Sequence, residues 1–182
     1  MFELKYWNVF FVIVCVWILV RLIKNLRSKN FSLKHEAKML LVLLGIVVIV
    51  RIVYFPWHHV DGKIGTLKFD SSKILPLWIN FTPIIHMFDS YDGWQMNIIG
   101  NITMFIPIGI FWPLCFKELN TIGKSILAGV GFPLFIEITQ LFFYERCTDI
   151  DDLLMNTTGY IIGTLIYFGV RKLWYNQQKC HR

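Results

Sequence analysis

Eight polar residues stand at positions where their side chains could meet inside a largely apolar chain. They are Asn97, Asn101, Glu137, Gln140, Arg146, Asp149, Asp152 and Asn156. Together they offer amides, carboxylates and one guanidinium, which donate and accept hydrogen bonds. A guanidinium binds phosphate or carboxylate bidentately, and a carboxylate removed from water can serve as a general base. The set could therefore bind a polar or anionic ligand, or act on it.

The spacing of these residues favours helices. Four positions separate the first two asparagines, and three separate the glutamate from the glutamine, so each pair shares one helical face. The last stretch continues a single face through five residues, which are Asp149, Asp152, Asn156, Gly159 and Gly163. We therefore expect three helices to carry the polar residues toward one another.

The elements that must position these residues are long apolar runs. The chain has 182 residues, of which 55% are hydrophobic and 16% charged, whereas soluble domains carry about 25% charged residues. A helix needs about 20 apolar residues to cross a bilayer. Five runs approach that length: Tyr6–Ile23, Met39–Phe55, Asn97–Phe116, Ile122–Phe143 and Leu153–Val170. The sequence predicts an all-α polytopic membrane protein with about five transmembrane helices.

A further apolar segment, "ILPLWINFTPIIHMF", precedes the third helix. It contains Pro76 and Pro83, and prolines inside a helix break its hydrogen bonding. We expect a re-entrant or interfacial segment here. The chain should form one structural unit, with two N-terminal helices in residues 1–74 and a three-helix core with its tail in residues 75–182.

The distribution of charge predicts the orientation. Residues 21–38, 117–124 and 171–182 hold 12 Lys or Arg and 2 acidic residues, whereas residues 1–5, 61–92 and 145–152 hold 5 and 9. Lys and Arg accumulate on the cytoplasmic side, so the N-terminus should lie outside and the C-terminus in the cytoplasm. The polar residues then lie at similar depth in the outer half of the membrane.

The composition also restricts the classes of partner and cofactor that we expect. The basic residues flank apolar runs and form no continuous basic face, so we expect no nucleic acid. The stretch "RLIKNLRSKN" is instead typical of a positive-inside anchor on anionic lipid. The four cysteines show no CxxC or zinc spacing, and we expect no metal site and no cofactor.

The polar residues allow both structural and functional interpretations. A carboxylate within a span costs at least about 2.5 kcal/mol, so Glu137 should face the bundle, with Asn101, Arg146 or Asn156 as partner. It is either a functional group or a hydrogen-bonded strut. The acids near Arg146 either cap a helix or serve a ligand site. The GxxxG of the last helix either packs within the monomer or forms a homo-oligomer.

Three blocks together resemble the VanZ-like family of membrane proteins. They are "NIIGNITMFIPIGIFWPL", "IEITQLF" and "RCTDIDDLLMNTTGYIIG", and the preceding "WINFTPI" resembles the family's N-x-x-P segment. The resemblance covers about Leu75 to Val170. The motif positions matched are Asn97, Asn101, Phe105, Pro107, Gly109, Glu137, Gln140, Arg146, Asp149, Asp152, Asn156, Gly159 and Gly163.

The resemblance implies a cell-envelope role, because the family is named for a protein that gives resistance to the glycopeptide teicoplanin. We expect an outward-facing polar pocket that binds an envelope lipid or lipid-linked precursor, with Arg146 on the anionic group. The alternative is a membrane-embedded hydrolase or transferase acting on a lipid phosphate, with Glu137 as base. A third possibility is a bundle that assists another membrane protein.

Overall fold

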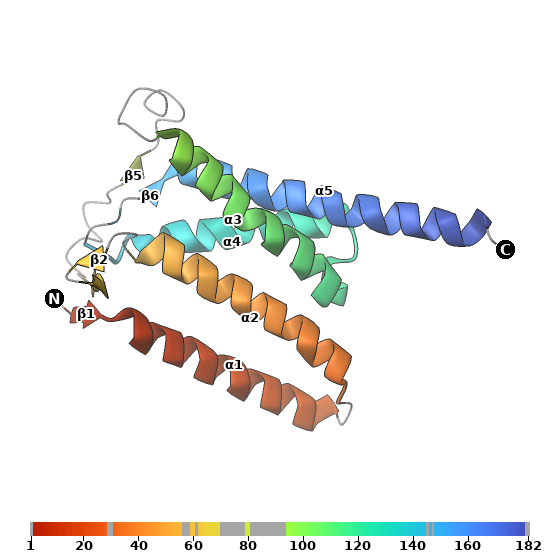
Figure 1. The fold of residues 1–182 in the computed structure, drawn as a ribbon, viewed down its shortest axis with the longest axis horizontal. Helices are drawn as coiled ribbons and strands as arrows, with labels where there is room; N and C mark the ends of the chain where they lie inside the picture. The colour runs from red at the N-terminus through yellow and green to blue at the C-terminus, as the bar shows by residue number, and fades with distance from the viewer. Residues whose placement is uncertain are drawn as a thin grey trace. The chain divides into compact units, whose positions relative to one another are not determined.

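Helices account for most of the computed structural model, which describes residues 2–28, 31–55, 59–60, 62–69, 79–80, 94–144, 146 and 148–180. The long helices of these ranges are α1 (Tyr6–Ser28), α2 (Leu33–Tyr54), α3 (Trp94–Cys115), α4 (Ile122–Gln140) and α5 (Ile150–Cys180) (Figure 1). Each is long and apolar enough to cross a membrane. A 3-10 helix, η2 (Lys117–Leu119), lies between α3 and α4. The predicted all-α polytopic fold is confirmed.

The helix ends differ from the predicted apolar runs. Helix α2 begins at Leu33 rather than Met39, and α4 ends at Gln140 rather than Phe143. Helix α5 has 31 residues and continues to Cys180, well beyond the predicted Val170. At 1.5 Å per residue, α5 is about 46 Å long, which exceeds the roughly 30 Å of the hydrocarbon core. Its polar last turns therefore extend out of the membrane.

Short strands connect the chain outside the helices. Strand β1 (Phe2–Leu4) pairs with β4 (Leu67–Phe69) in antiparallel fashion, and β2 (His59–Val60) pairs likewise with β3 (Lys63–Ile64). Strands β5 (Ile79–Asn80) and β6 (Thr148–Asp149) are parallel. Apart from β5, the segment predicted to be re-entrant or interfacial lies outside the described residues. Strands of two or three residues are too short to give a periodic signal in sequence.

The contacts divide the chain into two compact units. The first comprises Met1–Trp78 and Thr139–Cys147, and the second comprises Ile79–Ile138 and Thr148–Arg182. The stretch after α4 belongs to the first unit because its backbone joins β4. The backbone N–H of Tyr144 donates to the carbonyl of Lys68 at 2.9 Å. The last two residues of α4 are thus grouped with the first unit.

Within the first unit, α1 and α2 are held together at both ends. At one end Arg21 pairs with Glu36, with 3.0 Å between Nε and Oε2. At the other, the guanidinium of Arg51 lies 5.8 Å from the ring centroid of Tyr6 and donates to the carbonyl of Phe55 at 3.3 Å. Arg51 is therefore satisfied by an aromatic ring and a backbone oxygen at the end of α2.

Within the second unit, α3 and α5 pack closely through glycines. A Cβ atom at Gly159 would clash with the carbonyl of Ile102, and one at Gly163 would clash with that of Ile106. The face that bears the GxxxG motif is thus occupied by α3 of the same chain. Helix α4 joins the pair through a hydrogen bond of 3.1 Å between the hydroxyls of Ser125 and Thr164.

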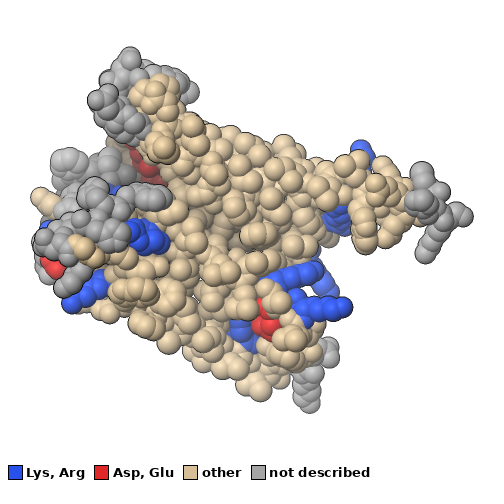
Figure 2. Space-filling model, viewed as in Figure 1, with Lys and Arg blue, Asp and Glu red and all other residues tan. Residues whose placement is uncertain are grey.

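The outer surfaces of the helices are apolar. The side chain of Phe11 on α1 is 60% exposed and that of Leu127 on α4 is 73% exposed. Figure 2 shows that Lys, Arg, Asp and Glu gather near helix ends on the face in view, whereas the helix lengths are almost free of them. Such exposed apolar surface is stable in contact with lipid rather than water.

Candidate functional site

Glu137 holds the start of α5 through two hydrogen bonds. Its carboxylate oxygen Oε2 accepts the backbone N–H of Asp149 at 3.1 Å, and its backbone carbonyl accepts the hydroxyl of Thr148 at 2.7 Å. The side chain is only 2% exposed. The carboxylate thus lies inside the protein, as the energetic cost of exposure to lipid requires. Its observed partner is a backbone amide rather than a side chain predicted from the sequence.

Asp149 caps α5 and connects it to the segment before α3. Its Oδ1 accepts the backbone N–H of Asp151 at 2.9 Å, and its Oδ2 accepts the side-chain amide of Asn80 at 3.2 Å. The parallel pairing of β5 with β6 sets Asn80 opposite Asp149. A carboxylate at this position satisfies a free N–H group of the first turn and suits the positive end of the helix dipole.

A second hydrogen-bonded group joins α3 to α5. The side-chain amide of Asn101 donates to Asp152 Oδ1 at 2.7 Å and to Asn97 Oδ1 at 3.1 Å. Asn97 is exposed, whereas Asn101 and Asp152 are half-buried. The short bond to a carboxylate is of the stronger, charge-assisted kind. The helical faces matched in the sequence therefore do meet at this pair.

Asn156 lies one helical turn beyond Asp152 and is almost wholly enclosed. Its side chain is 2% exposed, and its Oδ1 accepts no hydrogen bond from any residue in the described ranges. A buried polar atom without a partner destabilises the fold by about 1–3 kcal/mol. This oxygen is thus a candidate acceptor for a hydrogen-bond donor on a ligand.

These residues form a polar cluster within the second unit. Hydrogen bonds and electrostatic interactions connect Asn80, Asn97, Asn101, Glu137, Asp149 and Asp152, and we count Asn156 with them because it follows Asp152 by one turn of α5. The carboxylates of Asp149 and Asp152 lie close enough to Glu137 to interact with it electrostatically. The cluster is rich in acceptors and negative charge, so it favours ligand groups that donate hydrogen bonds. Over the described residues, no group of three or more His, Cys, Asp or Glu is placed to hold a metal ion.

Gln140 and Arg146, the other two residues predicted for the site, belong to the first unit. The side-chain amide of Gln140 donates to the carbonyl of Val53 at 3.5 Å, and its side chain is 4% exposed. The backbone N–H of Arg146 donates to the carbonyl of Phe143 at 3.3 Å. Six of the eight predicted residues thus lie in the second unit, and these two do not.

Two residues that form hydrogen bonds with Asp149 or Glu137, namely Asn80 and Thr148, were not among the predicted site residues. Asn80 does occupy the N-x-x-P segment noted in the sequence, which was the available signal. Thr148 gives no such signal, because its hydroxyl bonds a backbone carbonyl. Contacts of this kind depend on how two segments approach each other rather than on residue type.

The comparisons with known proteins agree with the fold. The VanZ/LLP1 family model matches residues 9–174. The chain therefore belongs to the VanZ/LLP1 family and is a multi-pass membrane protein. The match includes α1 and α2, so it extends beyond the stretch from Leu75 to Val170 that carries the motif blocks.

A curated relative is Protein VanZ from Enterococcus faecium. It is 35% identical over 104 residues, which are 57% of this chain and 60% of the relative. The aligned part thus spans about three fifths of the relative's length. No solved structure matches the chain.

Proposed function

We propose that this protein binds an envelope lipid, or a lipid-linked precursor, at the polar cluster and thereby lowers susceptibility to teicoplanin-type glycopeptides. The supporting observation is the hydrogen-bonded pair Asn101–Asp152, together with the unpaired, buried oxygen of Asn156 one turn further along α5. Polar side chains within membrane helices are costly and are usually retained for function.

The chemistry of the cluster indicates which part of a ligand it would recognise. Carboxylates and amide oxygens accept hydrogen bonds from hydroxyl and amine groups, which occur in lipid headgroups and in sugar or peptide precursors. Phosphate would be repelled by Asp149 and Asp152 and requires a cation. Arg146 remains the predicted partner for that phosphate, on the basis of the sequence.

The proposed orientation places the cluster toward the outer face. Asn97 is near the start of α3 and Asp149 precedes α5, so both lie at the same end of the two helices. The excess of Lys and Arg at the opposite ends supports an N-terminus outside and a C-terminus in the cytoplasm. Similarity to Protein VanZ supports a role in the envelope.

Binding accounts for the geometry better than catalysis does. A general base must come within hydrogen-bond reach of the proton that it abstracts, whereas Glu137 is only 2% exposed and its Oε2 is directed at the backbone N–H of Asp149. Turnover of a purified lipid phosphate by the protein would reverse this preference and favour a hydrolase or transferase.

The binding test is lipid mass spectrometry of the purified full chain. We expect one headgroup class to co-purify with the native protein and to be depleted from the Asn101→Ala and Asp152→Asn variants. Glu118→Gln is the matched control because Glu118 is an exposed acid on η2, outside the cluster. Thermal unfolding verifies that each of the four proteins is folded. Identical lipid profiles for all four would then contradict the proposal.

The functional test compares teicoplanin susceptibility in strains that express matched amounts of each protein. We expect Asp152→Asn and Arg146→Ala to give the susceptibility of the empty vector, and Glu118→Gln to give that of the native chain. Full protection by both Asp152→Asn and Arg146→Ala would show that neither the cluster residue nor Arg146 is needed for resistance activity.

A further inference from the structure

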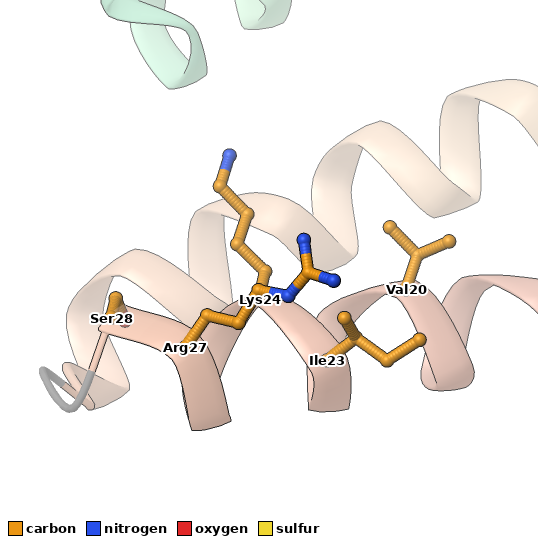
Figure 3. Close-up of a pocket in the computed structure, with 5 residues that line it drawn as sticks. All are labelled: Val20, Ile23, Lys24, Arg27 and Ser28. Carbon is orange, nitrogen blue, oxygen red and sulfur yellow. The ribbon is translucent and has the colours of Figure 1, made fainter.

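A recess of about 430 Å³ lies at the C-terminal end of α1, within the first unit. The described residues that line it are Val20, Ile23, Lys24, Arg27 and Ser28 (Figure 3). Their spacing of three and four residues places them along one face of the last helical turns. Figure 3 shows the side chain of Arg27 extending back along α1 beside Lys24. The recess thus combines two aliphatic side chains with two cations.

The two cations are not neutralised by the neighbouring acid. Glu36 is the acidic residue of the α1–α2 region, and its carboxylate is engaged by Arg21 and by the amide of Asn25 at 3.1 Å. Across the described ranges, the side chains of Lys24 and Arg27 make no hydrogen bond or ion pair, and both residues are exposed. Arg21 therefore has a structural role, whereas Lys24 and Arg27 retain their charge for an external partner.

The position of the recess along the helix matches the layers of a bilayer. Helix α1 has 23 residues and is about 34 Å long at 1.5 Å per residue, so its last turns reach the headgroup layer. Val20 and Ile23 lie on the hydrocarbon side of Lys24 and Arg27. Long cationic side chains at such a depth extend toward the headgroups.

We propose that this recess is a binding site for one anionic phospholipid. Lys24 and Arg27 contact the phosphate and negatively charged headgroup, and an acyl chain lies against Val20 and Ile23. A soluble phosphate would leave the aliphatic part of the recess unused, and a zwitterionic lipid lacks the net negative charge that two exposed cations attract. The site is separate from the polar cluster, which belongs to the other unit, and does not depend on the function proposed there.

The test is native mass spectrometry of the full chain in detergent, titrated with phosphatidylglycerol or phosphatidylcholine. We expect one phosphatidylglycerol to bind and phosphatidylcholine to bind far more weakly. The variant Lys24→Gln/Arg27→Gln should weaken phosphatidylglycerol binding about thirtyfold, since each cation near an anionic surface contributes about fivefold in affinity. Because neither side chain has a partner among the residues that the structure describes, the variant should unfold at the native temperature.

The matched control is Lys34→Gln/Lys117→Gln, which removes the same charge from exposed residues outside the recess. It should retain affinity to within about twofold. Equal weakening in both double variants would show general charge attraction and overturn the site. Unchanged binding in Lys24→Gln/Arg27→Gln, equal binding of phosphatidylcholine, or displacement of the lipid by millimolar glycerol phosphate would also overturn it.

Discussion

Oε2 of Glu137 accepts the backbone N–H of Asp149 at 3.1 Å, so a buried carboxylate on α4 anchors the residue that caps α5. A hydrogen bond between Thr148 and the carbonyl of Glu137 reinforces this attachment. The structural interpretation of Glu137, as a hydrogen-bonded strut, therefore has direct geometric support. If Glu137 binds a ligand, it does so while also positioning α5.

Replacement of Glu137 should destabilise the protein according to whether an acceptor remains. Glu137→Ala leaves the half-buried N–H of Asp149 without its acceptor, which should lower the free energy of unfolding by about 1–3 kcal/mol. Glu137→Gln keeps a carbonyl oxygen and should lose less. Thermal unfolding in detergent measures both, and exposed Glu118→Ala is the control. A Glu137→Gln variant less stable than Glu137→Ala would contradict the interpretation of Glu137 as a hydrogen-bonded strut.

The cap at Asp149 predicts a local effect on the first turn of α5. Asp149→Ala removes the acceptor of the Asp151 N–H and the partner of Asn80. The expected loss is about 0.5–2 kcal/mol. Asp149→Asn should retain most of the cap. Hydrogen exchange at the Asp151 amide should accelerate in Asp149→Ala, and equal exchange in the two variants would show that the side chain is not the cap.

The pair Asn101–Asp152 should show coupling in a double-mutant cycle. Its hydrogen bond of 2.7 Å involves a carboxylate, and such bonds contribute about 1.5–3 kcal/mol. With Asn101→Ala and Asp152→Ala we expect a coupling energy of at least about 1 kcal/mol after allowance for partial exposure. The cycle of Asn101→Ala with Glu118→Ala should show none. Additive effects in the first cycle would exclude a direct interaction.

The glycines of α5 predict opposite effects from one kind of substitution. A methyl group at Gly159 or Gly163 meets the backbone of α3, whereas one at Gly169 meets no atom within 4 Å. Gly159→Ala and Gly163→Ala should therefore destabilise by about 1–3 kcal/mol. Gly169→Ala should be neutral or stabilise by about 0.4–1 kcal/mol.

Thermal unfolding of the three glycine variants, each compared with the native chain, measures this difference. A Gly159→Ala variant as stable as Gly169→Ala would mean that α3 and α5 do not approach as closely as the structure shows. The variant Gly169→Leu provides a further control, because the leucine side chain at this position would be exposed.

Hydropathy was sufficient to predict the five long helices. Lipid-facing helices are recognisable because length and apolar content are set by the bilayer. The sequence placed Asn101 and Asp152 on helical faces at similar depth, but it did not pair them with each other; the partners it proposed were those of Glu137. By contrast, the C-terminal third of α5 was missed because its last turns are polar, so hydropathy carries no information there.

The partner of Glu137 could not be predicted because a backbone N–H belongs to every residue except proline. Residue types suggested side-chain partners, whereas the parallel pairing of β5 and β6 presents a backbone amide. Gln140 illustrates the same limit, since its side chain bonds the carbonyl of Val53. Periodicity identifies which residues share a face but does not show which backbone groups approach it.

The contact between Glu137 and Asp149 also constrains how the chain is inserted during synthesis. Glu137 leaves the ribosome before Asp149 does, so α4 enters the translocation channel with a carboxyl group that has not met its amide. Release into hydrocarbon at that moment is unfavourable, and we expect α4 to remain in the channel until α5 arrives. Nascent chains that end before residue 149 and continue in a flexible spacer long enough to clear the ribosome tunnel should then photo-crosslink to the channel through α4, and chains with the same spacer that include all of α5 should not.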